Sequence, residues 1–447
     1  MILTKPSLAQ GLFKFLDTLQ VEYCVVGDIS SFPDTITGDI DIIIPQNEIQ
    51  RVNQILGRFC RQSGAQILQV LQHEQNAFYF VLYVRSEKQE NIFLHPDICG
   101  DYYRNARLLL KARDILETRQ QATDEKGIPR GFSVPAPDYA FIYYLLKKID
   151  KNELNSAHGA YLSQQWHLNP EGARELLSRY WNVETVKMLS VAAEVDNWAL
   201  VQKNITHLQK TFRRKAPRYG SILIKESLRI INRIVEPTGL FIVFLGADGS
   251  GKSTVIDNVS TAVSPAFRRI QQFHFRPDFF SRNRKKNSKK IVSDPHKDKP
   301  YGITKSILKL IYYFFDYVLG YFFLIEPSRI RSTLVVCDRY FQDILVDPKR
   351  YRYGAPLKII NWCRKLIPQP DIIFLLDAPK EILQQRKQEV SPAESQRQRM
   401  AYIELVQHCD IGHIIDASQP LDVVNAKVEN IICQYLSDRT EKRLRLN

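Results

Sequence analysis

The chain has 447 residues, of which 44% are hydrophobic and 25% charged, and its formal net charge is +14. This length is too great for one ordinary core, and the composition is typical of folded globular domains and excludes a largely disordered chain. The positive charge favours anionic partners, namely nucleotides, phosphorylated substrates, nucleic acid or a membrane surface.

The seven cysteines are scattered and form no Cys-x-x-Cys pair. This pattern argues against a zinc site or a disulfide framework and favours reduced thiols. The N-terminal residues lack the long apolar core and cleavage site of a signal peptide. We therefore expect a cytoplasmic protein, with contact at the inner membrane surface left open.

Residues 1–132 are predicted to form the first domain, an α+β fold. Apolar periodicity predicts strands at 22–26, 40–44, 78–84 and 91–98 and a helix at 48–62. Gly27 follows the first strand, and Asp39 and Asp41 stand at the second. Carboxylates at i and i+2 on a strand point to one face and can share a divalent ion.

This glycine with a spaced Asp-x-Asp resembles the minimal nucleotidyltransferase fold, although Asp28 replaces the usual second small residue. The resemblance implies a third carboxylate ligand on a later strand. Asp97 is the best candidate, and Phe93 is the alternative occupant of that position, which would leave the metal site incomplete. The same fold could also be an inert or sugar-binding scaffold.

Residues 133–236 are predicted to be a helical region that ends in a basic linker. Helical spacing is found at 139–149 and 173–189, and the basic stretch 211–220 carries Pro and Gly, as linkers do. A basic amphipathic helix is predicted at 221–235. It can pack on its own domain or lie on anionic lipid.

Residues 237–447 alternate strands and helices and predict an α/β domain with a parallel sheet covered on both faces. The expected strands are 241–245, 270–275, 334–337, 372–376 and 414–415. The apolar segment 307–325 carries Lys309 and Asp316, and we interpret it as a buried or groove-lining helix, with membrane contact as the alternative.

The sequence FIVFLGADGSGKST (residues 241–254) is a strand followed by Gly-x-x-x-x-Gly-Lys-Ser. Such a loop directs backbone N–H groups and a helix N-terminus at phosphates, while the lysine reaches the β/γ-phosphates and the serine suits Mg²⁺. We therefore predict an ATP site with Mg²⁺. The predicted ATP-binding residues are Gly246, Gly249, Ser250, Gly251, Lys252, Ser253 and Thr254.

A second motif, Asp338-Arg339-Tyr340, ends the strand predicted at 334–337. An aspartate at a strand end that faces the loop can bind Mg²⁺, and an arginine can bind phosphate through two N–H groups. The expected metal ligands are Ser253 and Asp338, and Lys252, Asp338 and Arg339 are expected to be catalytic.

Together with FLLDAPKEILQQRKQE and HIIDASQPLDVV, these motifs resemble the thymidylate kinase family of P-loop kinases over most of 240–436. The resemblance implies a doubly covered parallel sheet and transfer of phosphate from ATP. It further implies a basic lid at 384–399 with catalytic arginines Arg386, Arg397 and Arg399. The implied acceptor-binding residues are Asp248, Arg276, Arg339 and Tyr340.

The sequence departs from the family where thymidine would be recognised. Leu245 replaces an acidic residue, and residues 341–356 read FQDILVDPKRYRYGAP in place of the usual serine and Tyr-Gln signatures. We therefore expect a small-molecule acceptor that is a nucleotide or sugar and not dTMP.

The basic insertion 281–290 is interpreted as a solvated loop, with contact to an anionic acceptor or membrane as the alternative. It lacks interleaved aromatic residues, so specific nucleic-acid binding is not expected. Two alternatives to the kinase remain open. One is a nucleotidyltransferase acting through the Asp-x-Asp site, and the other is a nucleotide-gated interaction protein.

Overall fold

The computed structural model describes residues 3–86, 90–124, 126–217, 219–281, 298–386 and 391–446. The chain divides into two compact units, Met1–Asn232 with Leu436–Asn447 and Arg233–Tyr435. The division falls within helices α9 (Gly220–Val235) and α17 (Leu421–Leu444). The helical region predicted at 133–236 lies almost wholly in the first unit. Most of the basic insertion 281–290 lies outside the described residues.

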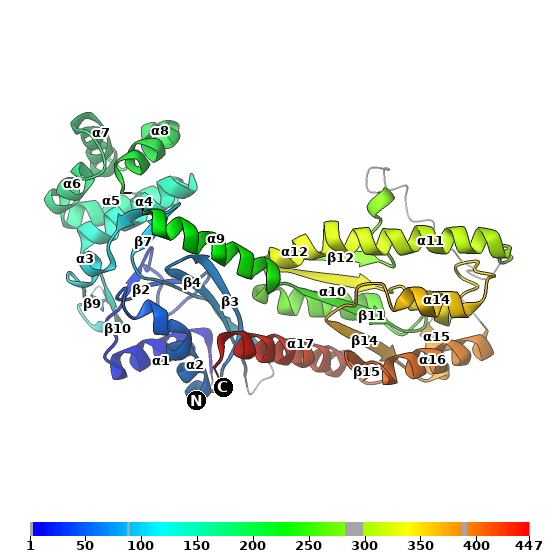
Figure 1. The fold of residues 1–447 in the computed structure, drawn as a ribbon. Helices are drawn as coiled ribbons and strands as arrows, with labels where there is room; N and C mark the ends of the chain where they lie inside the picture. Colours follow the sequence, from blue (N-terminus) through cyan, green and yellow to red (C-terminus); the bar gives the residue numbers. More distant parts are fainter. Residues whose placement is uncertain are drawn as a thin grey trace. The chain divides into compact units, whose positions relative to one another are not determined.

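The first unit contains a six-stranded mixed sheet in the order β1-β2-β6-β4-β3, with β5 paired to β4 (Figure 1). Only β2 and β6 pair in parallel, and the other neighbours are antiparallel. The strands are β1 (Cys24–Val26), β2 (Ile40–Ile43), β3 (Gln66–Glu74), β4 (Ala77–Arg85), β5 (Asn91–Leu94) and β6 (Pro96–Cys99).

Two short hairpins and the helices α1, α2 and α3 complete this α+β part. Helix α1 (Lys5–Thr18) buries Leu12 and Phe13, and α2 (Val52–Ser63) buries Leu56 and Phe59 in the same core. The hairpins pair β7 (Tyr102–Arg104) with β8 (Arg107–Leu110) and β9 (Gln120–Thr123) with β10 (Pro129–Val134), and the short helix α3 (Ala112–Leu116) lies between them in sequence.

The strand predicted at 91–98 is two strands, which is a correction. β5 pairs with β4, and β6 begins at Pro96 and pairs with both β2 and β4. Proline has no backbone N–H to donate, so it is tolerated at the first residue of a strand and not within a continuous ladder. The break places β6 between β2 and β4, which brings Asp97 opposite Asp41.

The helical part of the first unit packs around buried tryptophans, among them Trp166 and Trp181. The predicted helix 173–189 is two helices, because the chain turns at 179–182 and the Asn182 side chain caps the second of them. The predicted linker 211–220 is shorter than expected, since α8 continues to Lys215. The helices are α4 (Pro137–Lys151), α5 (Ser156–Leu168), α6 (Pro170–Ser178), α7 (Val183–Glu194) and α8 (Ala199–Lys215).

The second unit contains a fully parallel five-stranded sheet in the order β12-β13-β11-β14-β15, as the apolar runs predicted. Every residue of the central strand is buried. The strands are β11 (Leu240–Leu245), β12 (Arg269–His274), β13 (Thr333–Asp338), β14 (Ile372–Asp377) and β15 (Gly412–Asp416). Because all five point the same way, their carboxyl ends share one edge of the sheet.

Helices flank this sheet (Figure 1). In chain order they are α10 (Lys252–Val263), α11 (Ile303–Gly320), the π-helical turn η4 (Tyr321–Ile325), α12 (Glu326–Ile330), α13 (Asp343–Val346), α14 (Leu357–Arg364), α15 (Lys380–Arg386) and α16 (Pro392–Gln407).

The segment 307–325, which we interpreted as a buried or groove-lining helix, is buried on one side only. Leu310 and Tyr317 are buried against the sheet, whereas Leu308 and Phe315 are exposed. By length and composition alone Ile303–Ile330 could span a membrane, since its most apolar 18 residues have a mean hydropathy of 1.5, and 28% of that stretch is buried.

Candidate functional site

The glycine loop joins the central strand β11 to α10, as its sequence predicted. Gly246 and Gly251 have φ values of 147° and 85°, which other residues rarely adopt. A Cβ on Gly246 would also lie 2.7 Å from the Leu376 carbonyl oxygen. Gly251 is the N-cap of α10, so the loop amides and the helix N-terminus meet at the carboxyl edge of the sheet.

Lys252 is buried beneath this loop. Its ammonium donates to the carbonyl oxygens of Gly246 and Ala247 at 2.9 and 3.0 Å and to Ser250 Oγ at 3.4 Å. Burial, and then the nearby charge of Arg339, lower the pKa of Lys252 to about 8. Ser253 and Thr254 follow at the start of α10 and are exposed.

The low pKa of Lys252 predicts a pH-dependent affinity for ATP. Below pH 8 the free lysine is protonated and attracts phosphate, and above pH 8 it is increasingly neutral, whereas bound phosphates favour its charged form. We expect the dissociation constant to rise by up to about tenfold per pH unit above 8. Calorimetry from pH 7.5 to 9.5 measures this rise.

The Lys252→Arg variant is the matched control, because arginine stays charged throughout this pH range. The ATP dissociation constant of this variant should therefore not change between pH 7.5 and 9.5. An ATP affinity that is the same for the unmodified chain at both ends of the range would contradict the prediction.

Asp338 ends β13, beside the loop strand, and lies in register with Phe244. His274 Nδ1 lies 3.2 Å from Asp338 Oδ2, whereas Oδ1 is buried and has no hydrogen-bond partner among the described residues. Burial opposes ionisation of this carboxyl group, but the His274 hydrogen bond and the charge of Lys252 outweigh it and lower the pKa. An ionised aspartate therefore has a free oxygen at the strand end.

Arg339, the next residue, lies at the centre of a buried ionic network. Its guanidinium pairs with Asp248 of the loop, and with Asp343 at 2.8 Å. Burial opposes its charged form, but Asp343, Tyr402 and Asp248 outweigh that effect and raise the pKa of Arg339 well above its usual value. Asp248 and Arg339 were both predicted to bind the acceptor, and they are neighbours in the structure.

Four members of this network were not assigned a role from the sequence. Asp343 is fully buried and accepts hydrogen bonds from the hydroxyls of Tyr351, at 2.7 Å, and Tyr402. Arg350 pairs with Asp248 at 2.9 Å. Arg339 precedes α13 and has a positive φ of 70°, so helical spacing gave no signal for its pair with Asp343. Nothing local in the sequence connects Tyr402 to the network.

The remaining predicted acceptor residues do not join this network. Tyr340 is fully buried, and its hydroxyl donates to the Pro368 carbonyl at 2.9 Å, so it is part of the core beneath the site. The guanidinium of Arg276 pairs with Asp278 at 2.8 Å and lies over the rings of Tyr312 and Tyr313.

The three lid arginines differ in their surroundings. Arg386 donates to the Ala417 carbonyl at 3.2 Å, and its Nη1 is 3.9 Å from where a Cβ on Gly251 would stand, so it lies beside the loop. Arg399 forms a two-bond ion pair with Asp377, and Arg397 pairs with Glu394 and with a carbonyl of α13. The lid residues 387–390 lie outside the described residues.

The first unit has a separate acidic cluster. Oxygen atoms of Asp39, Asp41 and Asp97 all lie within 4.8 Å of one another. The Lys147 ammonium of α4 lies 2.5 Å from Asp41 Oδ1. Burial, and then the charge of Asp41, raise the pKa of Asp97 to about 7. Asp97, and not the buried Phe93, completes the group of three carboxylates.

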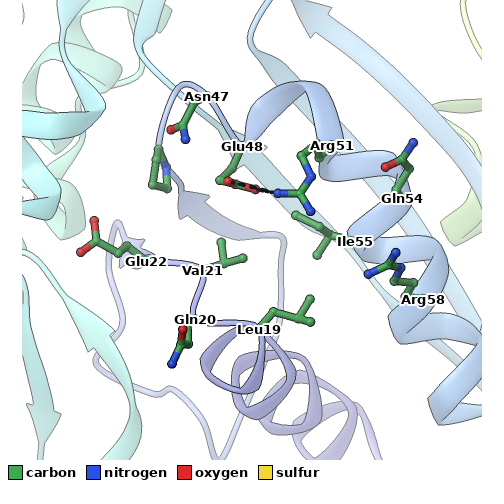
Figure 2. Close-up of a pocket in the computed structure, with 11 residues that line it drawn as sticks. Leu19, Gln20, Val21, Glu22, Asn47, Glu48, Arg51, Gln54, Ile55 and Arg58 are labelled. Atoms are coloured by element: carbon green, nitrogen blue, oxygen red, sulfur yellow. Dashed lines mark hydrogen bonds and ion pairs between the residues drawn. The ribbon is translucent and has the colours of Figure 1, made fainter.

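A pocket of about 330 Å³ lies at the other end of β1 and β2 from these carboxylates (Figure 2). Arg51 and Arg58 of the α2 region line it, and Glu48 pairs with Arg51 at 3.2 Å. None of the residues predicted to be functional lines this pocket, so it is separate from both candidate sites.

A parallel sheet with a glycine loop after its central strand, and an Asp-Arg pair at the end of the neighbouring strand, defines a P-loop kinase domain. Comparisons identify its kind. The Thymidylate kinase family model matches residues 244–428, which lie within the second unit. The C-terminal half of the chain therefore carries a thymidylate kinase family domain.

Two relatives, both thymidylate kinases, agree with this match. A thymidylate kinase of Xanthomonas oryzae pv. oryzae (strain PXO99A) is 24% identical over 224 residues, covering 46% of this chain and 88% of that protein. One of Lactobacillus acidophilus is 28% identical over 212 residues, covering 44% and 95%. A crystal structure of thymidylate kinase from Ehrlichia chaffeensis covers 44% of this chain and 100% of its own, with 17% identity and a TM-score of 0.32.

Proposed function

We propose that the second unit transfers a phosphoryl group from ATP, with Mg²⁺, to a small nucleotide or sugar acceptor other than dTMP. Two features support the donor side: the loop with its buried lysine, and the aspartate beside it. The loop amides and Lys252 would bind the donor phosphates, and Arg386 lies where it can reach them. Arg399 and Arg397 are paired with carboxylates and would have to exchange partners to act.

The residues at the loop fit a magnesium ion. Asp338 Oδ1 is a buried carboxylate oxygen without a partner among the described residues, and the Ser253 hydroxyl is exposed at the start of α10. These are the hard oxygen ligands that Mg²⁺ prefers. When bound, Mg²⁺ neutralises negative charge on the phosphate oxygens. Asp338 and Ser253 are the residues that would bind it.

The observation that carries the acceptor proposal is the position of Asp248 between Arg339 and Arg350. Arg350 comes from the 341–356 segment, where the sequence departs from the family. Two guanidinium groups held at the loop by one carboxylate are positioned in advance for an anionic acceptor, because little side-chain entropy is left to lose. We infer that Arg350 supplies a contact that dTMP recognition does not use.

A substrate screen tests this proposal. The full chain with ATP and Mg²⁺ is assayed for ADP release against nucleoside monophosphates, sugars and sugar phosphates, and products are verified by mass spectrometry. We expect turnover that depends on an acceptor other than dTMP, and Arg350→Gln should lower kcat/KM for that acceptor while the KM for ATP stays the same. Efficient and selective phosphorylation of dTMP would contradict it.

A second function is favoured by the three carboxylates of the first unit. Asp39, Asp41 and Asp97 could bind a divalent ion for nucleotidyl transfer, although Lys147 would have to move away from Asp41 or share it. We expect transfer of a labelled nucleoside monophosphate to survive in Lys252→Ala and to be lost in Asp39→Asn. Equal transfer by the Asp39→Asn variant and the unmodified chain would exclude this site.

A further inference from the structure

Helix α11 and the turn η4 carry several large apolar side chains that are exposed. Leu308, Ile311, Tyr312, Phe315, Phe322 and Phe323, which we name the α11 face, are all exposed, Phe323 to 63%. The first four are spaced as one side of a helix. Figure 1 shows this run of helix in yellow along one side of the parallel sheet. An exposed apolar surface of this extent is a mark of an interaction site.

Neighbouring aromatic side chains extend the α11 face. The ring of Phe280 packs on Tyr312 with centroids 5.6 Å apart, and Phe279 packs on Phe323 at the same separation. Phe280 is itself 51% exposed. The surface is therefore rich in phenylalanine and leucine, which interfacial helices bury at the boundary of a bilayer.

Positive charges gather near the N-terminal end of α11. Lys305 lies 4.2 Å above the ring of Tyr301, and Lys309 donates to the Tyr351 carbonyl at 2.7 Å. Among the described residues, no carboxylate forms an ion pair with either lysine. An apolar aromatic surface beside cations is complementary to anionic lipid.

We propose that the α11 face docks on the surface of an anionic lipid bilayer. The helix lies along the bilayer and does not cross it, because its other side is packed on the sheet and carries the buried Asp316, which accepts a hydrogen bond from the Phe280 amide. Charge favours lipid over a second copy of the chain, since two chains of +14 repel each other and phosphatidylglycerol attracts both.

Co-sedimentation with vesicles tests the proposal. The full chain should bind vesicles of phosphatidylcholine mixed with phosphatidylglycerol, and bind more weakly to phosphatidylcholine alone or at high salt. The triple variant Phe315→Ser, Phe322→Ser and Phe323→Ser should lose affinity by at least about tenfold, because it removes three large apolar side chains that the bilayer would bury. Circular dichroism verifies that the variant is folded.

The matched control is Trp362→Ser with Leu366→Ser, which removes exposed apolar side chains elsewhere in the same unit and should leave vesicle binding unchanged. The Lys252→Ala variant should also bind vesicles normally, so failure of the kinase assignment leaves this test intact. Absence of binding to anionic vesicles, or equal binding by the triple variant, overturns the proposal. A dimer that the triple variant converts to a monomer, without vesicle binding, also overturns it.

Discussion

Replacing Lys252 by alanine is expected to lower phosphoryl transfer by at least about 10²–10³-fold while the chain stays folded. The ammonium is the only cation that donates directly to the loop carbonyls among the described residues, and it lies where phosphate oxygens would replace those carbonyls. The transition state spreads negative charge over the phosphoryl oxygens, so loss of this charge acts mainly on kcat. Steady-state assays with the best acceptor from the screen measure it.

Asp39→Asn is the matched control for that experiment, because it changes a charged group in the other unit. It should leave ADP release with the acceptor unaltered. Normal acceptor phosphorylation by the Lys252→Ala variant would show that the loop is not the site of transfer. Loss in both variants would mean that the first unit takes part in the reaction.

Replacing Arg339 by methionine is expected to lower the free energy of unfolding by about 3–5 kcal/mol. Asp343 is fully buried, and Arg339 is the cation that compensates its charge at 2.8 Å. Removing one partner of a buried pair leaves the other charge without water or a counterion. Urea denaturation of the unmodified chain and the variant measures the difference.

Two further variants separate this explanation from a general loss of packing. Arg350→Met removes a more exposed cation from the same network and should cost about 1 kcal/mol or less. Adding Asp343→Asn to Arg339→Met removes the uncompensated charge and should restore part of the stability. An unchanged unfolding midpoint for Arg339→Met, or no recovery in the double variant, would contradict the assigned pairing.

The second unit could be predicted closely because its signals are local. A buried parallel strand is a continuous apolar run, as at β11, and a phosphate loop needs glycines at fixed spacing for φ values such as 147° at Gly246. Each motif followed a strand, and parallel strands place their ends together. Asp248 and Arg339, which are 91 residues apart in sequence, were brought together for that reason.

The parts that sequence could not predict depend on contacts between distant segments. Tyr340 follows the functional pair, but its side chain is buried in the core, where its ring packs edge-on against Phe241 and Tyr317. Tyr402 reaches Asp343 from a helix 59 residues away. The exposure of Phe315 depends on which side of α11 the sheet covers, and hydropathy alone does not distinguish the two sides.

Calorimetry with ATP and Mg²⁺ tests the central claim, that residues 246–253 bind a triphosphate, most directly. The Asp39→Asn chain is titrated so that the first unit contributes no nucleotide site. We predict one ATP bound per chain, and loss of that binding when Lys252→Ala is added to the same chain. No heat of binding in the Asp39→Asn chain, or the same heat after Lys252 is replaced, would contradict the account.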